Sequence, residues 1–286
     1  MHTTPTLATR FARNTFVIRS DTPLAEDQMR RAAPSIFAEG KHASRSERYT
    51  YIPTSEVLRG LRKQGFEPFM VAQGKSRIEG KTEFTKHMIR LRHVSSNDCQ
   101  IAKPEANEII LINSHDGASS YQLLAGRFRY ACSNGLVVGT VSNDIRIAHK
   151  GDARDDVIEG AFRVLDDFEA VDASSDAMKA LTLKPDAEMA FATAAHTLRF
   201  GLRSEGQAPA SVTAEQLTVA HRPEDVGNTL WLSLNRVQYN VIRGGLPGRT
   251  AQGRRITTRE VTSIDRNVSL NRALWLLAEE MRKLKA

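Results

Sequence analysis

The sequence predicts an α+β protein in which an antiparallel β-sheet of hairpins is packed by helices and the C-terminal half is mainly helical. β-prone segments follow one another closely between residues 66 and 148, and Gly, Asn, Asp and Ser in their linkers favour hairpin turns. After Gly151 the apolar residues recur at helical spacing. A chain of 286 residues, 41% of them hydrophobic, is large and apolar enough to bury a core.

The sheet is expected to follow a short helix. Thr54 or Ser55 is a suitable N-cap for a helix that ends at Gly65, because Pro53 breaks the β-prone segment before it. Strands are expected at residues 66–72, 83–94, 108–113, 120–132, 136–141 and 145–148. Ser133-Asn134-Gly135 is the clearest hairpin signal, since Asn and Gly tolerate positive φ angles.

Helical segments are expected from Gly151 to the C-terminus. Asp155 and Asp156 suit the positive end of the first helix dipole, and its apolar residues run to Phe168. Further helices are expected at 187–202, at 229–243 and along the apolar stripe from Leu270 to Leu284. We therefore expect a flexible N-terminal arm at 1–48, a sheet domain with a basic face at 49–205, and a helical region with a basic Gly/Arg loop at 206–286.

The chain is basic, and its charge is unevenly distributed. The net charge is +7 and the pI is about 9.6, which favours acidic partners such as nucleic acid. Residues 1–151 carry a net +8, residues 152–176 carry −7, residues 177–235 carry −1 and residues 236–286 carry +7. The two cysteines are too few for a disulfide framework or a zinc finger. Without an export signal or membrane-spanning segment, we expect a cytoplasmic protein with no membrane partner.

Cations on two strands are candidates for DNA contacts. Alternation places Lys86, Arg90 and Arg92 on one side of the strand at 84–94, and Arg127 and Arg129 on one side of the strand at 121–132. If both sides align in one sheet, these five cations form a surface suited to phosphates. The alternative is a solvated outer face of an amphipathic sheet.

A second group of candidate DNA contacts lies in the Gly/Arg loop that begins at Gly244. The loop has no acidic residue before Glu260, which favours a mobile arm that closes over a polyanion. The alternative is a long interhelical loop that its arginines keep soluble. The candidate residues are Arg249, Arg254 and Arg255 in this loop, together with Lys150 near the start of the first long helix.

Residues 113–121, with the sequence NSHDGASSY, are the densest group of reactive side chains. His115 could act as a base with Asp116, and His87, His93 or Glu108 could add metal ligands. None of them has the spacing of a metalloprotease motif or of paired catalytic carboxylates. Asp116-Gly117 is also a strong turn signal. Catalysis and a structural turn remain two alternatives at this position, and we expect no cofactor and no bound metal.

Several strings resemble a known family in the same order along the chain. They are YTYIPT at 49–54, NSHDG at 113–117, FRYACSNGLVV at 128–138 and HKG at 149–151. This pattern resembles a family carried on plasmids and phages and catalogued as domain of unknown function nine-three-two. The resemblance implies an association with mobile DNA and no particular activity.

The order of the elements is also similar to the single-strand annealing domain of the eukaryotic recombination mediator. That domain forms oligomeric rings with DNA in a basic outer groove, and the residues here that would occupy such a groove are Lys86, Arg90, Arg92, Arg127, Arg129 and Lys150. The alanine- and lysine-rich helix typical of that family is absent from this sequence.

The leading hypothesis is a DNA-binding protein of a plasmid or phage. It would bind single-stranded DNA and promote strand annealing or recombination as a homo-oligomeric ring or filament. One alternative is a metal-dependent nuclease or hydrolase centred on His115 and Asp116. Another is an interaction protein that counters a host defence or repair factor through the acidic segment at 152–176.

Overall fold

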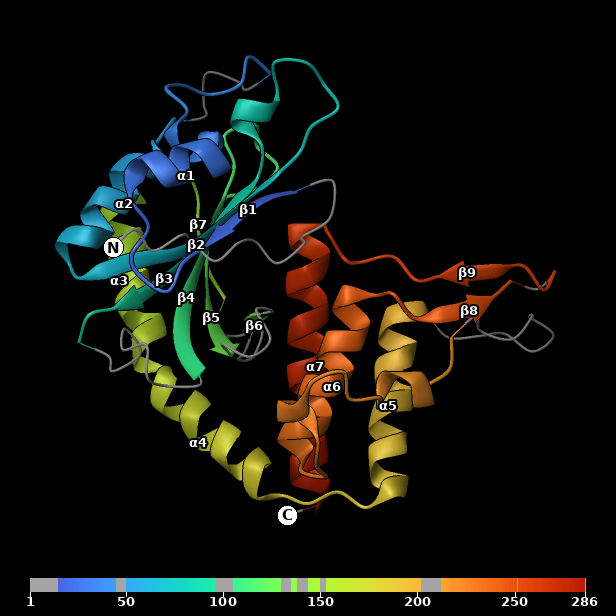
Figure 1. Ribbon diagram of the computed structural model, residues 1–286. Coiled ribbons are helices and arrows are strands. Elements are labelled where there is room, and N and C mark those ends of the chain that lie inside the picture. Colours follow the sequence, from blue (N-terminus) through green and yellow to red (C-terminus); the bar gives the residue numbers. More distant parts are fainter. Residues whose placement is uncertain are drawn as a thin grey trace, which may run out of the picture. The chain divides into compact units, whose positions relative to one another are not determined.

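The computed structural model describes residues 15–44, 50–95, 105–129, 135–137, 144–149, 153–201, 212–250 and 252–285. The chain divides into two units (Figure 1): the first comprises Met1–Gly135 and Thr140–Phe168, and the second comprises Leu136–Gly139 and Glu169–Ala286. The antiparallel sheet and the helical C-terminal part confirm the α+β class. The division falls near Phe168, earlier than the boundary expected at residue 205.

An antiparallel sheet forms the centre of the first unit. The strands are β1 (Thr15–Arg19), β2 (Phe66–Gly74), β3 (His87–His93), β4 (Glu105–Asn113), β5 (Tyr121–Arg129), β6 (Gly135–Val137) and β7 (Ile145–Ile147). Their order in the sheet is β1-β2-β3-β4-β5-β6, and β7 also pairs with β5. Of β6, only Gly135 is assigned to the first unit, and Leu136 and Val137 are assigned to the second. Neighbouring strands from β2 to β5 are antiparallel, as expected for successive segments with turn-forming residues in their linkers, and β1 is antiparallel to β2.

Helices cover one face of this sheet (Figure 1). They are α1 (Glu26–Ala32), α2 (Thr54–Lys63) and α3 (Ala153–Asp166), with the 3-10 turns η1 (Pro34–Phe37) and η2 (Thr82–Phe84). Val57, Leu58 and Leu61 of α2 share one face and are buried, as their spacing predicted. Gly160 lets α3 approach the sheet closely, because a Cβ at this position would lie 2.6 Å from the Leu123 side chain.

Residues 15–44 belong to the first unit, although the sequence predicted a flexible arm there. β1 pairs with β2 along its whole length, and Leu24, Met29 and Ile36 are buried. The prediction is wrong for these residues, because β1 finds its backbone partners in a strand about 50 residues further along the chain, which local composition does not reveal. Residues 1–14 and 45–49 lie outside the described part of the chain.

The second unit is mainly helical. Its helices are α4 (Phe168–Ala180), α5 (Pro185–Phe200), α6 (Leu230–Arg243) and α7 (Ile264–Lys285), with the 3-10 turns η5 (Glu215–Leu217) and η6 (Pro223–Asp225). α7 packs against α5 and α6, and Leu270 and Leu274 of its apolar stripe are buried, whereas Leu284 is 79% exposed. The buried Arg236 of α6 forms an ion pair with Glu188 of α5. None of the helices in the described ranges has the length and apolarity needed to cross a membrane.

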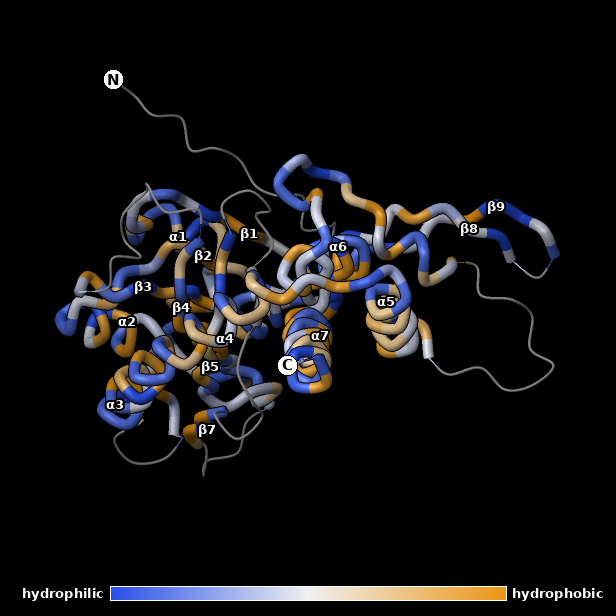
Figure 2. Tube along the Cα trace, turned by 90° about the horizontal axis from the view of Figure 1, so that it is seen from below, coloured by the Kyte–Doolittle hydropathy of each residue, from blue (hydrophilic) through white to orange (hydrophobic). Residues whose placement is uncertain are grey.

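The Gly/Arg loop of the sequence is partly a β-hairpin. Its strands are β8 (Pro247–Arg249) and β9 (Arg255–Thr257), which pair in antiparallel register. The hairpin projects beyond α5, α6 and α7 in both views of this unit, and its tip is hydrophilic (Figures 1 and 2). The expected loop is therefore a hairpin in the described part of the chain. Residue 251 is outside that part.

Candidate nucleic-acid interface

The predicted basic face is divided between the two sides of the sheet. Directly opposed residues of antiparallel strands share a face, and the register pairs Arg90 with Ile110 and Ile110 with Leu124. Because side chains alternate along a strand, Arg127 and Arg129 project from the face opposite to that of Leu124. The expectation that both pairs of arginines line one surface is therefore wrong.

Arg90 and Arg92 are buried around a glutamate of β4. Glu108 is 0% exposed, and its carboxylate lies 2.5 Å from Arg90 Nε, 2.8 Å from Arg92 Nη2 and 3.9 Å from Arg19 Nη1. Burial by itself raises the pKa of Glu108, but the guanidinium groups of Arg90, Arg19 and Arg92 outweigh it and hold that pKa below its usual value. These cations neutralise an internal charge and do not face solvent.

Arg127 and Arg129 are engaged in the same way by Glu105. Its carboxylate lies 2.8 Å from Arg127 Nη2 and 3.6 Å from Arg129 Nε, and Arg127 also donates to Asn107 Oδ1 at 2.9 Å. Arg127 is buried for this reason. The signal that the basic-face prediction missed is the pair of glutamates on the strand between the two arginine-bearing strands.

The two candidate lysines do not restore a basic face. Lys86 immediately precedes β3 and is half-buried. Lys150 lies outside the described residues. The sheet arginines and Lys86 are therefore not part of the interface that we consider further.

Asp116 shapes the turn between β4 and β5. Its Oδ1 accepts a hydrogen bond from the Ala118 N–H at 2.9 Å, its Oδ2 lies 3.2 Å from Lys81 Nζ, and Gly117 has a φ angle of 79°. Burial by itself raises the pKa of Asp116. The hydrogen bond from the Ala118 N–H and the contact with Lys81 outweigh this effect, so the pKa of Asp116 lies below its usual value. These contacts are those of an Asx turn.

His115 belongs to a buried polar network centred on the Thr54 hydroxyl. His115 Nε2 lies 3.1 Å from Thr54 Oγ1, and His87 Nε2 lies 3.0 Å from the same oxygen. Asn113 Nδ2 donates to Thr54 Oγ1 at 2.9 Å, and Asn113 Oδ1 lies 2.8 Å from His149 Nε2. The network therefore ties the start of α2 to β3, to the end of β4 and to the segment after β7.

The Thr54 hydroxyl can donate once and accept twice, so the groups around it carry complementary protons. His87 Nδ1 lies 2.9 Å from Ser35 Oγ and 3.3 Å from the Thr85 carbonyl, and because a hydroxyl can donate or accept, these contacts are compatible with either tautomer of His87. Thr54 Oγ1 accepts from Asn113 Nδ2 and also lies 3.3 Å from Tyr121 Oη. His115 Nδ1 has no hydrogen-bond partner among the described residues.

Burial keeps these histidines neutral. It is the largest cause that lowers the pKa of His115 to about 4, with His149 adding to the effect and Asp116 opposing it. Burial also lowers the pKa of His87 and of His149. Within the described ranges, no three His, Cys, Asp or Glu side chains are gathered closely enough to hold a metal ion. His115 is therefore a neutral member of a buried hydrogen-bond network, and Asp116 stabilises a turn.

The hairpin of the second unit carries the exposed candidate residues. We call residues 247–257 the arginine arm. Arg249 and Arg255 stand directly opposite each other across β8 and β9, and Arg254 lies in the connecting turn. All three side chains are exposed, and none forms an ion pair within the described chain. Three of the nine DNA-contact candidates from the sequence are thus brought together on one projecting element.

The base of the arm is fixed by close backbone packing. Gly244 ends α6 with a φ angle of 68°, and a Cβ there would lie 2.7 Å from the backbone carbon of Arg259. Arg199 of α5 reaches across this base, because its Nε donates to the Val241 carbonyl at 3.3 Å and its Nη2 to the Arg259 carbonyl at 3.0 Å. The arm is therefore anchored to the ends of α5 and α6.

More cations surround this base. Arg243 and Arg259 are exposed, and burial followed by the nearby Arg266 cation lowers the pKa of Arg199. From Arg243 to Arg259 the chain has five exposed arginines and no acidic residue. A like-charged surface of this kind favours a polyanion as its ligand.

Aromatic rings lie next to these cations. Tyr239 of α6 is half-buried, with the Arg222 guanidinium 4.4 Å and the Arg243 guanidinium 5.0 Å from its ring centroid. Arg199 lies 5.4 Å from the Phe200 ring centroid at the end of α5. Planar guanidinium and aromatic groups are the side chains on which unpaired bases stack.

Comparison with known proteins identifies the family but no activity. The chain is 49% identical over 275 residues to UPF0380 protein YafZ and 48% identical over 275 residues to UPF0380 protein YfjQ, both of Escherichia coli (strain K12). Each alignment covers 96% of this chain and 97% of the relative. No solved structure is significantly similar. Residues 41–275 match the family described as Domain of unknown function (DUF932), and the chain belongs to that family.

Proposed function

We propose that this protein binds nucleic acid through the arginine arm and that its preferred partner is single-stranded DNA. The observation that carries the proposal is the pair of Arg249 and Arg255, which oppose each other across the hairpin and are both exposed. Like charges directly opposite each other on two strands destabilise a hairpin. A polyanion seated on the arm removes that repulsion, because its phosphates stand between and beside the two cations.

The arginine geometry favours phosphate over a small acidic ligand. Guanidinium groups bind phosphate oxygens in a planar, bidentate manner. The arm supplies three of them at its tip, while Arg243 and Arg259 continue the positive surface to its base. A ligand with charges repeated along its length matches this extended surface better than one with a single charge.

The surroundings of the arm favour a single strand over a duplex. Tyr239 and Phe200 lie beside arginines near the base of the arm, and both residues are partly exposed. Bases of a single strand are free to stack on such groups, whereas the bases of a duplex are already stacked on each other. Strand annealing is the proposed outcome, since annealing proteins hold one strand while base pairing supplies the free energy. In the cell this activity would take place in the cytoplasm.

Fluorescence anisotropy with labelled oligonucleotides tests the proposal. We expect the triple variant Arg249→Gln, Arg254→Gln, Arg255→Gln to bind a single strand more weakly and with a lower salt dependence. Each phosphate contact contributes about 0.7 to the log–log salt slope on a single strand, so three lost contacts lower the slope by about 2. A matched control removes three exposed cations of the first unit, as Arg59→Gln, Lys63→Gln, Arg77→Gln.

The outcomes of this experiment are distinct. Weaker binding by the arm variant alone supports the proposal, whereas an equal loss in the control variant indicates only a dependence on net charge. Unchanged affinity and slope in the arm variant would refute the arm as the interface. A parallel series with EDTA addresses the hydrolase alternative, because DNA that is shortened only without EDTA indicates metal-dependent cleavage.

A further inference from the structure

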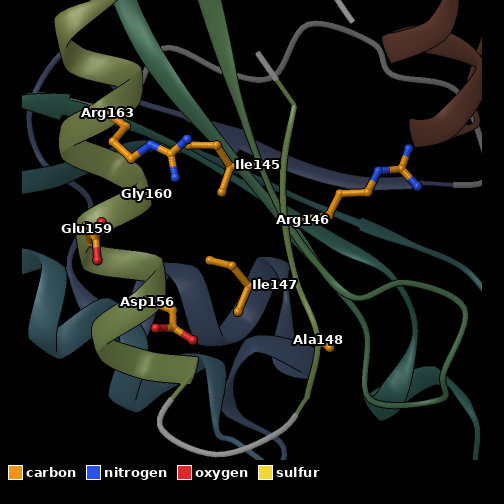
Figure 3. Close-up of a pocket in the computed structure, with 8 residues that line it drawn as sticks. All are labelled: Ile145, Arg146, Ile147, Ala148, Asp156, Glu159, Gly160 and Arg163. Atoms are coloured by element: carbon orange, nitrogen blue, oxygen red, sulfur yellow. The ribbon is translucent and has the colours of Figure 1, made fainter. Parts of the chain in front are cut away.

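A second exposed feature lies on the first unit, between the short strand β7 and helix α3 (Figure 3). It is a groove of about 360 Å³. Ile145 and Ile147 point from the strand toward the helix, and Asp156 and Arg163 reach back from the helix toward the strand. Glu159 also lines the groove. The strand wall thus consists of Ile145, Ile147 and Ala148, with Arg146 directed away from the helix, and the helix wall is mostly charged.

The two acidic residues of the helix wall, Asp156 and Glu159, have no cationic partner among the described residues of the groove. Asp156 and Glu159 are exposed and one turn apart on α3, and neither forms an ion pair within the described chain. Arg163 lies one further turn along the helix. An arginine or lysine side chain fits such a place, because its alkyl stem packs on isoleucines while its charged end reaches the carboxylates.

The strand wall offers backbone groups as well. Among the described strands, β7 pairs with β5 alone, through Tyr121 opposite Ile147 and Leu123 opposite Ile145. A strand paired on one side presents a row of N–H and C=O groups on its other edge. A peptide in extended conformation can add to such an edge and direct alternate side chains into an adjacent groove.

We infer that the groove between β7 and α3 receives the arginine arm of a second copy of this chain. The arm is a β-hairpin with exposed arginines and no acidic residue, so its backbone suits the β7 edge and its side chains suit Asp156 and Glu159. The local charges support this pairing, since the groove has two exposed carboxylates and the arm has three exposed arginines.

This contact is head-to-tail. Each copy has a groove on its first unit and an arm on its second, so the same contact can repeat from copy to copy and produce a ring or a filament. The inference shares the arm with the proposed function but does not require it. If both hold, nucleic acid and the groove compete for one arm, and a single strand in excess dissociates the assembly.

Charge reversal on each side of the contact tests the inference. In sedimentation velocity we expect the wild type to associate with rising concentration. Asp156→Lys, Glu159→Lys should weaken self-association by about tenfold or more, because about 1.4 kcal/mol corresponds to a factor of ten and two charge pairs become repulsive. Arg249→Glu, Arg255→Glu should do the same. Glu79→Lys, Glu83→Lys, which reverses two exposed charges elsewhere on the first unit, should not.

Mixing the two variants provides the decisive measurement. The reversed groove of one variant complements the reversed arm of the other, so an equimolar mixture should associate although neither variant does so alone. A monomeric wild type at all concentrations, or a mixture that stays monomeric, would overturn the inference. If the groove variant has lost its fold by circular dichroism, Asp156→Asn, Glu159→Gln replaces it, and unchanged association in that variant would also overturn the inference.

Oligonucleotide binding separates this inference from the proposed function. The groove variant retains its arm, so it should bind a labelled single strand at least as well as the wild type. A wild type that binds the strand but never self-associates contradicts the groove contact alone. A wild type that self-associates through the groove but does not bind the strand contradicts the proposed function alone.

Discussion

Acid should destabilise the first unit through its buried histidines, and His115 allows the magnitude to be worked out. Its pKa is about 4 in the folded protein and about 6.5 in an unfolded chain. The unfolded chain therefore binds more protons than the folded one between these two values. The contribution of neutral His115 to stability is fully present above pH 6.5, and it is lost as the pH falls toward 4.

The size of this effect follows from the linkage relation. Each pKa unit corresponds to about 1.4 kcal/mol, so the complete loss is about 3 kcal/mol, of which about 2 kcal/mol falls between pH 7 and pH 5. His87 and His149 have pKa values lowered by the same burial and add to the loss in the same direction. The free energy of unfolding of the wild type should therefore fall by about 2 kcal/mol or more over this interval.

Urea unfolding at pH 7, 6 and 5 measures this directly. A His115→Gln variant keeps a side-chain N–H donor near Thr54 and cannot be protonated, so its stability should fall by about 2 kcal/mol less than that of the wild type. If the wild type and His115→Gln lose the same free energy between pH 7 and pH 5, the reasoning about His115 is refuted.

Three further substitutions test the buried contacts by urea unfolding at pH 7. Glu108→Gln should cost about 3 kcal/mol or more, because it leaves Arg90 and Arg92 buried without their carboxylate; a loss below about 1 kcal/mol would contradict the internal ion pairs. Thr54→Val should cost about 1–3 kcal/mol, since it leaves the buried groups around its hydroxyl unsatisfied, and a neutral effect would disprove its central role. Gly244→Ala should destabilise the protein more than Gly245→Ala, which has a similar φ angle of 82° but nothing within 4 Å of its added Cβ; equal losses would exclude the backbone clash as the cause.

The sequence was sufficient for elements whose signal is local. The helix at 54–63 was predicted by three apolar residues on one face and a glycine after it. The expected cap was wrong, because Pro53 is the N-cap, no side chain caps the helix, and Thr54 and Ser55 lie inside it. The strands from β2 to β5 were predicted by β-prone segments between turn-forming residues. β8 and β9 were not, because each has only three residues, and the Gly, Pro and Arg among them have little preference for strands.

The candidate site depended on information that is not local. Alternation along one strand fixes which side chains share a face, but a shift of one residue between strands exchanges the faces completely. The sequence therefore placed Arg90 and Arg127 each within its strand and could not place them relative to each other. It also could not bring Thr54, His87 and His149 together, since these residues are separated by 33 to 95 positions and meet only through tertiary packing.

Whether a strand arginine of this protein is buried or exposed depends on the charge of the residues on the neighbouring strand. Arg90 and Arg92 have a glutamate on the next strand, and burial strengthens that attraction until the carboxylate stays charged inside the protein. Arg249 has Arg255 across from it, and both remain in solvent, where the repulsion is screened but not removed. An arrangement that costs stability in the isolated chain and is relieved by an anionic partner is more informative about binding than total charge. The proposal of a nucleic-acid ligand therefore rests on the arginine arm and not on the larger number of cations in the sheet.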